Sequence, residues 1–95
     1  MKTITPKEIE MTYEEVNIID VRETNEVAAG KIPGALNIPL GLIEPRMNEL
    51  DKSKEYVLVC RSGGRSSQAA QFLENQGFNV MNMDGGMINY KGKIE

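Results

Sequence analysis

Histidine and tryptophan are absent from this 95-residue chain, and cysteine occurs only once. Without an imidazole, Ser-His-Asp and Cys-His catalytic arrangements are excluded, and a single thiol supplies too few ligands for a structural zinc site. One cysteine also cannot form an intramolecular disulfide, so no disulfide stabilises the fold. We therefore expect a protein that uses neither a metal nor a cofactor.

An excess of positive charge is missing as well, because the formal net charge is -3 at pH 7. No basic stripe is available to neutralise phosphates, which argues against nucleic-acid binding. The first ten residues, MKTITPKEIE, lack the apolar core of a signal peptide, and no apolar run approaches the length of a membrane span. The sequence thus predicts a cytoplasmic protein with a reduced thiol, and the lack of a long apolar surface pattern favours a monomer.

Length and composition predict a single domain over residues 1–95, built around a parallel sheet. A chain of 95 residues, 40% hydrophobic and 26% charged, is sufficient for one core and too short for two. Short apolar runs alternate with helical patterns, as they do in α/β proteins. The expected strands are NIID with its end at residue 21, a short strand near residues 36–38, residues 56–59, and FNVMNM.

Four helices are expected as well. Thr5, Pro6 and Glu8 form the pattern of a capping box with proline at the first helical position. The other expected helices are TNEVAAG with Thr24 as its N-cap, a helix that begins near Pro45, and SSQAAQFLENQG, which begins near Ser66 and ends at Gly77.

Cys60 occupies the junction between the clearest strand and the clearest helix, in the stretch VLVCRSGGRSS. Ligands of open α/β sheets bind beyond the carboxyl ends of the strands, so this position is a candidate site. A free cysteine that simply ends a core strand is the alternative. The residues that follow Cys60 favour the site.

The segment from Arg61 to Ser66 has the properties of an anion-binding loop. None of its residues is proline, so each has a backbone N–H, and Gly63 and Gly64 can adopt positive φ so that these groups turn inward. The following helix adds its positive N-terminus, and the guanidinium groups of Arg61 and Arg65 add full charges. We therefore predict that the neighbouring thiol is ionised at neutral pH.

Three segments resemble the rhodanese-like (sulfurtransferase) family in its small single-domain form. CRSGGRS is similar to the active-site loop of that family, which starts with cysteine and has arginine five positions on, followed by serine or threonine. IIDVRETNEVAAGKIPGALNIPL resembles its Asp-Val-Arg signature with a short acidic helix and a Gly-x-Ile-Pro-Gly-Ala turn. DGGMINY resembles its double-glycine segment near the C-terminus. The three occur in the family's order, from about residue 18 to residue 90.

The resemblance implies a fold and a reaction. The fold is an α/β domain with a central parallel five-stranded sheet flanked by helices. In the reaction Cys60 takes the outer sulfur of a small anionic donor such as thiosulfate and holds it as a persulfide. A thiol or cyanide acceptor then removes this sulfur, in ping-pong kinetics, and the acceptor can be a protein in a sulfur relay.

The resemblance also assigns residues to roles. It makes Cys60 the nucleophile and gives substrate binding to the loop residues Arg61, Ser62, Gly63, Gly64, Arg65 and Ser66. Asp20 and Arg22 match the Asp-Val-Arg element and are expected to support the loop, with an ordinary ion pair at a strand end as an equal alternative. Two departures concern the rim of the pocket: Lys31 replaces a frequent histidine, and residues 87–90 lack the tryptophans that often follow the double glycine.

Two other functions compete with this interpretation. A module that binds a persulfide, senses oxidants or carries sulfur would use the same thiolate without turnover, and any disulfide would need an outside partner. A cysteine-dependent phosphatase is less favoured, because such loops are typically one residue longer, with arginine six positions after the cysteine. In this chain that position is Ser66.

Overall fold

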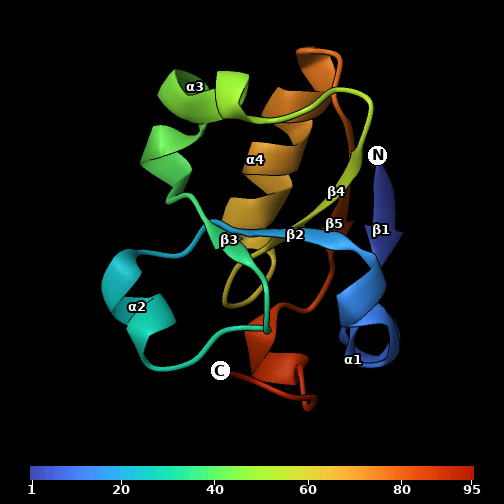
Figure 1. The fold of residues 1–95 in the computed structure, drawn as a ribbon, viewed down its shortest axis with the longest axis vertical. Helices are drawn as coiled ribbons and strands as arrows, with labels where there is room; N and C mark the ends of the chain where they lie inside the picture. Colours follow the sequence, from blue (N-terminus) through green and yellow to red (C-terminus); the bar gives the residue numbers. More distant parts are fainter.

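The computed structural model describes residues 1–95 and contains one five-stranded sheet in which every neighbouring pair of strands is parallel. The strands lie in the order β1-β5-β4-β2-β3, so β4 is central. Their bounds are Lys2–Ile4 for β1, Asn17–Asp20 for β2, Leu36–Asn37 for β3, Glu55–Val59 for β4 and Asn79–Met83 for β5. The parallel five-stranded sheet expected from the sequence is confirmed (Figure 1).

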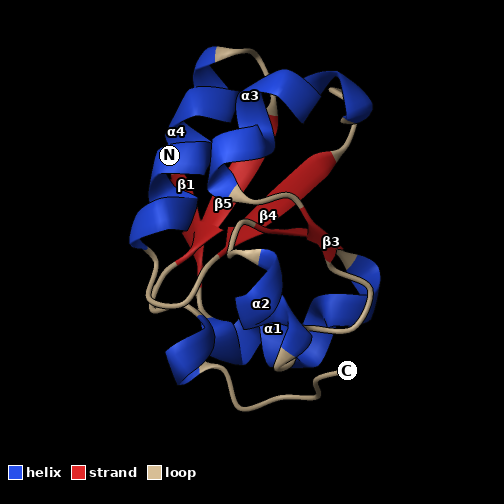
Figure 2. Cartoon of the chain, turned by 90° about the vertical axis from the view of Figure 1, so that its left-hand side faces the viewer, coloured by secondary structure: helices blue, strands red, loops and turns tan.

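Helices cover both faces of the sheet. The α-helices are α1 at Pro6–Thr12, α2 at Thr24–Ala28, α3 at Ile43–Arg46 and α4 at Gly64–Asn75. Short 3₁₀ turns follow at Tyr13–Glu15, Leu40–Leu42, Met47–Glu49 and Met87–Asn89. Figure 2 shows α3 and α4 above the strands, and α1 and α2 below them. None of these helices combines the length and the apolar character that a membrane crossing requires.

The alternation of side chains along β4 divides the core between the two faces. Tyr56 and Leu58 point toward α4 and join the larger cluster of buried side chains, whereas Val57 and Val59 join the cluster on the α1 side. Cys60 continues this alternation one residue beyond the strand and belongs to the α4 side. The pleat of the central strand therefore directs the only thiol of the chain toward the N-terminus of α4.

Several boundaries differ from the sequence-based expectation. Thr5 and Glu8 form the expected capping box, but the N-cap of α2 is Glu23 instead of Thr24. There the Glu23 amide donates to the Glu26 carboxylate at 2.9 Å, so an acidic pair replaces the usual hydroxyl cap. The third helix already begins at Ile43 and tolerates Pro45 in its first turn, where no intrahelical amide bond is needed.

The N-terminal strand β1 is the fifth strand, which the residue pattern did not locate. It is only three residues long and pairs with β5 at the edge of the sheet. A segment this short carries no alternation that distinguishes it from a loop, so only its pairing reveals it.

Candidate active site

Cys60 lies directly after β4, at the edge of the sheet where parallel strands end. Its neighbour Val59 pairs with Asp20 at the end of β2, so the candidate loop starts beside the Asp-Val-Arg segment. Cys60 is only 1% exposed, and it therefore lies beneath the loop rather than at an open rim.

The Cys60 sulfur accepts hydrogen bonds from this loop. The Gly63 amide donates to Sγ at 3.0 Å, and the Ser66 hydroxyl donates to Sγ at 3.3 Å. Burial raises the pKa of the Cys60 thiol, but hydrogen bonds from the Ser66 hydroxyl and from the Ser66, Gly63 and Ser62 amides lower it by more, so its net pKa is below the ordinary value. The inward-turned amides expected from the sequence are present.

A single glycine provides the turn that aims these amides. Gly63 has φ of 108° and serves as the N-cap of α4, which then begins at Gly64 and not near Ser66 as expected. Only glycine adopts this conformation without strain, whereas Gly64 has an ordinary helical backbone. Because α4 begins two residues earlier than expected, Ser66 lies within its first turn and is fully buried against the sulfur.

The double-glycine segment holds the loop from its other side. The Met87 amide donates to the Cys60 carbonyl at 2.9 Å, and the Ile88 amide donates to the Arg61 carbonyl at 3.0 Å. Gly86, with φ of 66°, passes so close that a Cβ at this position would overlap the Arg61 carbonyl and lie 2.6 Å from the Ser62 nitrogen. The loop is thus fixed between α4 and the 3₁₀ turn Met87–Asn89.

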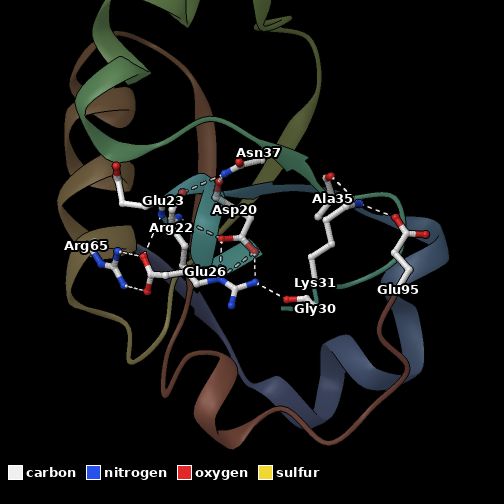
Figure 3. A network of polar contacts seen from close by, with 10 residues as sticks. All are labelled: Asp20, Arg22, Glu23, Glu26, Gly30, Lys31, Ala35, Asn37, Arg65 and Glu95. Atoms are coloured by element: carbon white, nitrogen blue, oxygen red, sulfur yellow. Dashed lines mark hydrogen bonds and ion pairs between the residues drawn. The ribbon is translucent and has the colours of Figure 1, made fainter. Parts of the chain in front are cut away.

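The two arginines of the loop differ in their surroundings, and Arg65 is already engaged by another side chain. Arg65 forms a two-point ion pair with Glu26 of α2, with Nη1–Oε1 at 2.6 Å and Nη2–Oε2 at 2.9 Å (Figure 3). The Arg65 bond is the main reason that the pKa of Glu26 falls to about 2. Most of the Arg65 charge is therefore neutralised by Glu26. The pKa of Cys60 is lowered mainly by hydrogen bonds to its sulfur.

Arg61 is exposed and has no ion-pair partner. It lines an open hollow of about 430 Å³ beside the loop, together with Arg22, Glu26, Met87 and Ile88. A larger hollow of about 560 Å³ lies away from the loop, near the C-terminal residues 93–95. The hollow of about 430 Å³ is the one that contains a free guanidinium from the loop.

Asp20 and Arg22 form a buried ion pair at the end of β2. Arg22 Nε lies 3.0 and 3.1 Å from the two Asp20 carboxylate oxygens, and Arg22 Nη2 donates to Asp20 at 2.8 Å and to the Gly30 carbonyl at 2.8 Å (Figure 3). The Asn37 side chain donates to the carbonyls of both residues. Neither side chain hydrogen-bonds to residues 60–66, so the expected support of the loop is not a direct contact.

Asn82 and Glu26 were not singled out in the sequence, although both contact the loop, and Gly86 was noted only as part of the double-glycine segment. Asn82 is 2% exposed, and its Nδ2 donates to the Gly63 carbonyl at 3.4 Å and to Asp84 Oδ1 at 2.9 Å, while its Oδ1 has no partner. An unpaired buried oxygen costs about 1–3 kcal/mol, so this amide is an unfavourable choice for packing alone. The only sequence signal for Asn82 is a polar residue between two methionines near the end of β5.

Comparison with known proteins agrees with this geometry. A family model described as "Rhodanese-like domain" matches residues 5–93. YtwF of Bacillus subtilis, named as a candidate sulfurtransferase, is 49% identical over 82 residues, which cover 86% of this chain and 80% of YtwF. YrkF of the same organism, named as a candidate sulfur carrier protein, is 46% identical over 83 residues, which cover 86% of this chain and 45% of YrkF.

A solved structure has the same fold along the whole chain. The rhodanese-like domain protein from Staphylococcus aureus superimposes with a TM-score of 0.93 at 36% sequence identity, and the match covers 100% of this chain and 97% of that one. The names of the two sequence relatives both concern the transfer or carriage of sulfur. The family match and the shared fold show that this chain belongs to the rhodanese-like domain family.

Proposed function

We propose that the protein is a sulfurtransferase in which Cys60 carries the transferred sulfur as a persulfide. The observation that supports this most directly is the pair of donors at Sγ, the Gly63 amide at 3.0 Å and the Ser66 hydroxyl at 3.3 Å. Hydrogen bonds to an ionised acceptor are stronger than bonds between neutral groups. The loop therefore stabilises negative charge at this sulfur.

In the first half-reaction the Cys60 thiolate attacks the outer sulfur of a thiosulfate-like donor. A new S–S bond forms between Sγ and that sulfur, the bond to the sulfonate sulfur breaks, and sulfite leaves with the electron pair. No general base is required because the thiolate is already formed, in keeping with a chain that has no histidine. Arg61, which is free of ion pairs, binds the anionic end of the donor in the neighbouring hollow.

In the second half-reaction a thiolate or cyanide attacks the terminal sulfur of the persulfide. The acceptor leaves as a persulfide or as thiocyanate, and the electrons of the broken S–S bond restore the Cys60 thiolate. Because Cys60 is 1% exposed, this site selects small donors and acceptors, or a protein acceptor with an extended thiol. Sulfite leaves before the acceptor reacts, and the Cys60 persulfide links the two half-reactions, so ping-pong kinetics follow.

Intact-mass analysis after incubation with thiosulfate tests the covalent step. The parent protein is expected to gain the mass of one sulfur atom, and addition of cyanide is expected to remove it. Cys60→Ser is the matched control and should gain nothing, because no other thiol exists in the chain. If the parent protein remains unmodified with every sulfane donor, the persulfide mechanism is wrong.

A sulfur carrier that is loaded once, without turnover, is the second candidate. The burial of Cys60 and the likeness to YrkF support it, since a buried persulfide is protected until a specific partner receives it. Steady-state assays separate the two functions. Many thiocyanate molecules formed per protein favour the enzyme, whereas loading without release to small acceptors favours the carrier.

A phosphatase is disfavoured by the state of Arg65. Its guanidinium is bound at both ends by Glu26, so it is not available to bind a phosphate over the thiol. We expect no hydrolysis of an aryl phosphate under conditions in which thiosulfate loads Cys60.

A further inference from the structure

Ser66 has two acceptors within reach of a single hydroxyl proton. Its Oγ lies 3.3 Å from the Cys60 sulfur and 3.2 Å from the Gly63 carbonyl oxygen. A hydroxyl donates only one hydrogen bond at a time, so the two acceptors compete for it. The proton stabilises a thiolate only when it is directed to the sulfur.

The Gly63 carbonyl is already supplied with donors. The Ser67 amide donates to it at 3.1 Å within the first turn of α4, and Asn82 Nδ2 reaches it from β5 at 3.4 Å. A carbonyl oxygen has two lone pairs, and these two N–H groups occupy both. The Ser66 hydroxyl therefore gains little by turning to Gly63.

The orientation of the Asn82 amide is fixed by its surroundings. Nδ2 faces two acceptors, the Gly63 carbonyl and the Asp84 carboxylate, so a flipped amide would place an oxygen against two oxygens. The unflipped amide leaves Oδ1 buried without a partner. An apolar residue would avoid this orphan oxygen, so the presence of an amide points to a role for its donors, which face Asp84 and Gly63.

We propose that Asn82 is a positioning residue, which saturates the Gly63 carbonyl and thereby directs the Ser66 hydroxyl proton to the Cys60 sulfur. This inference rests on the proposed function of Cys60 as a thiolate nucleophile. Asn82 does not contact the sulfur itself and acts only through the hydroxyl. It links the end of β5 to the reactivity of a loop that is far from it in the sequence.

Other charged groups also face the loop, and a test must keep them constant. They are Arg61 and Arg65 on the loop and the first turn of α4, Glu26 on α2, Arg22 after β2, and Asp84 after β5. A double-mutant cycle that changes only Ser66 and Asn82 leaves all of these side chains in place, and the loss of the Asn82–Asp84 hydrogen bond is common to both backgrounds.

The experiment measures the thiolate of Cys60 as a function of pH, by ultraviolet thiolate absorbance and by the rate of alkylation. Because the chain has a single cysteine, both signals report this thiol alone after subtraction of the Cys60→Ser baseline. The variants are Ser66→Ala, Asn82→Leu and their combination. Leucine has the same branching as asparagine, with methyl groups in place of the amide oxygen and nitrogen, and keeps water from replacing the lost donor.

Asn82→Leu is expected to lower the thiolate fraction about threefold to tenfold at a pH below the transition, because the Ser66 proton turns to the unsaturated carbonyl. Ser66→Ala should lower it at least as much. In the Ser66→Ala background, Asn82→Leu should cause no further change. Asn37→Ala removes a comparable amide of β3, which donates to the carbonyls of Asp20 and Arg22, and should leave the thiolate curve unchanged.

The proposal is overturned if Asn82→Leu shifts the curve equally in both backgrounds, or shifts it in neither. Circular dichroism and thermal unfolding establish that each variant is folded, and Asn82→Ala replaces the leucine variant if that one is not. The readout needs no sulfur donor or acceptor. A failure of sulfur transfer would therefore leave this result intact, and the two ideas are tested separately.

Discussion

At the scale of single residues, the state of Cys60 is decided by opposing effects on one sulfur atom. Burial favours the neutral thiol, whereas the hydroxyl of Ser66 and the amides of Ser66, Gly63 and Ser62 favour the thiolate and are stronger together. The Ser66 hydroxyl is the largest of the effects that lower the pKa, and the main-chain amides add to it, so substitution of one side chain removes only part of the effect. What matters is that the loop keeps its curvature.

The pH dependence of sulfur loading follows from this balance. Loading requires the thiolate, so its rate should rise with pH through a single transition and then reach a plateau, since no histidine adds a second transition. The lowered pKa of Cys60 places this transition below the ordinary value of a cysteine thiol. Single-turnover kinetics with thiosulfate measure the profile. A transition at the ordinary thiol value, or a bell-shaped curve, contradicts the geometry.

Gly86 offers a test of loop curvature that does not touch the sulfur. In Gly86→Ala the new Cβ overlaps the Arg61 carbonyl, and φ of 66° adds backbone strain. We expect a loss of about 3 kcal/mol in the free energy of unfolding, together with slower loading of Cys60. Gly34→Ala is the matched control, because Gly34 also has positive φ but no atom lies within 4 Å of its Cβ position.

The control should lose only about 1 kcal/mol and load sulfur normally. Chemical denaturation and single-turnover loading measure both quantities. Equal losses in the two variants would show that the close approach of Gly86 to Arg61 is unimportant.

At the scale of elements, the site is assembled where three segments meet the end of β4. These are the N-terminus of α4, the helix α2 and the 3₁₀ turn Met87–Asn89. The ion pair between Glu26 and Arg65 is the side-chain link between α2 and α4. Helix α2 has no buried residue of its own, so this link has a large share in fixing its position.

The Glu26–Arg65 pair should make stability depend on pH in a defined window. The pKa of Glu26 is lowered from 4.5 to about 2, so the pair contributes stability above pH 4.5 and loses it as the pH falls toward 2. In Glu26→Gln we expect a loss of about 1 kcal/mol at neutral pH, since both side chains are partly exposed and solvent screens them. Urea denaturation of parent and variant at several pH values should show this difference disappear near pH 2. A difference that is constant with pH argues against the pair.

The sequence predicts the local features of these elements better than the contacts between them. The capping box at Thr5, the strand before Cys60 and the loop amides depend on neighbouring residues, and these predictions are correct. Arg65 was expected to act on the thiol, but Glu26 is 39 residues away in the sequence and takes most of its charge. Such a pairing depends on how α2 packs beside α4, which no local pattern encodes.

At the scale of the whole molecule, the order β1-β5-β4-β2-β3 decides which residues become neighbours of the loop. It places the end of β2 on one side of Cys60 and the end of β5 on the other, so Asp20 and Asn82 flank the same loop. The resemblance to a family could supply this order, whereas the residues alone could not. The contact of Asn82 with Gly63 is a consequence of topology, and a strand pattern gives no sign of it.

Substitution in the buried pair of Asp20 and Arg22 distinguishes an effect on the stability of the fold from an effect on the Cys60 loop. Asp20 is 0% and Arg22 8% exposed, and removal of one charge leaves the other buried without compensation. We expect Asp20→Asn to lower the free energy of unfolding by about 3 kcal/mol, a large part of the stability of a small domain. Glu49→Gln, which breaks an exposed ion pair with Arg46, should have far less effect.

Because neither Asp20 nor Arg22 hydrogen-bonds to residues 60–66, the folded fraction of Asp20→Asn should still load sulfur at the parent rate. Urea denaturation gives the stability, and single-turnover loading at low temperature, normalised to the folded fraction, gives the rate. If loading slows while stability is retained, the pair acts on the loop. If stability falls and the rate remains, the pair fixes the end of β2 and reaches the sulfur only through the fold.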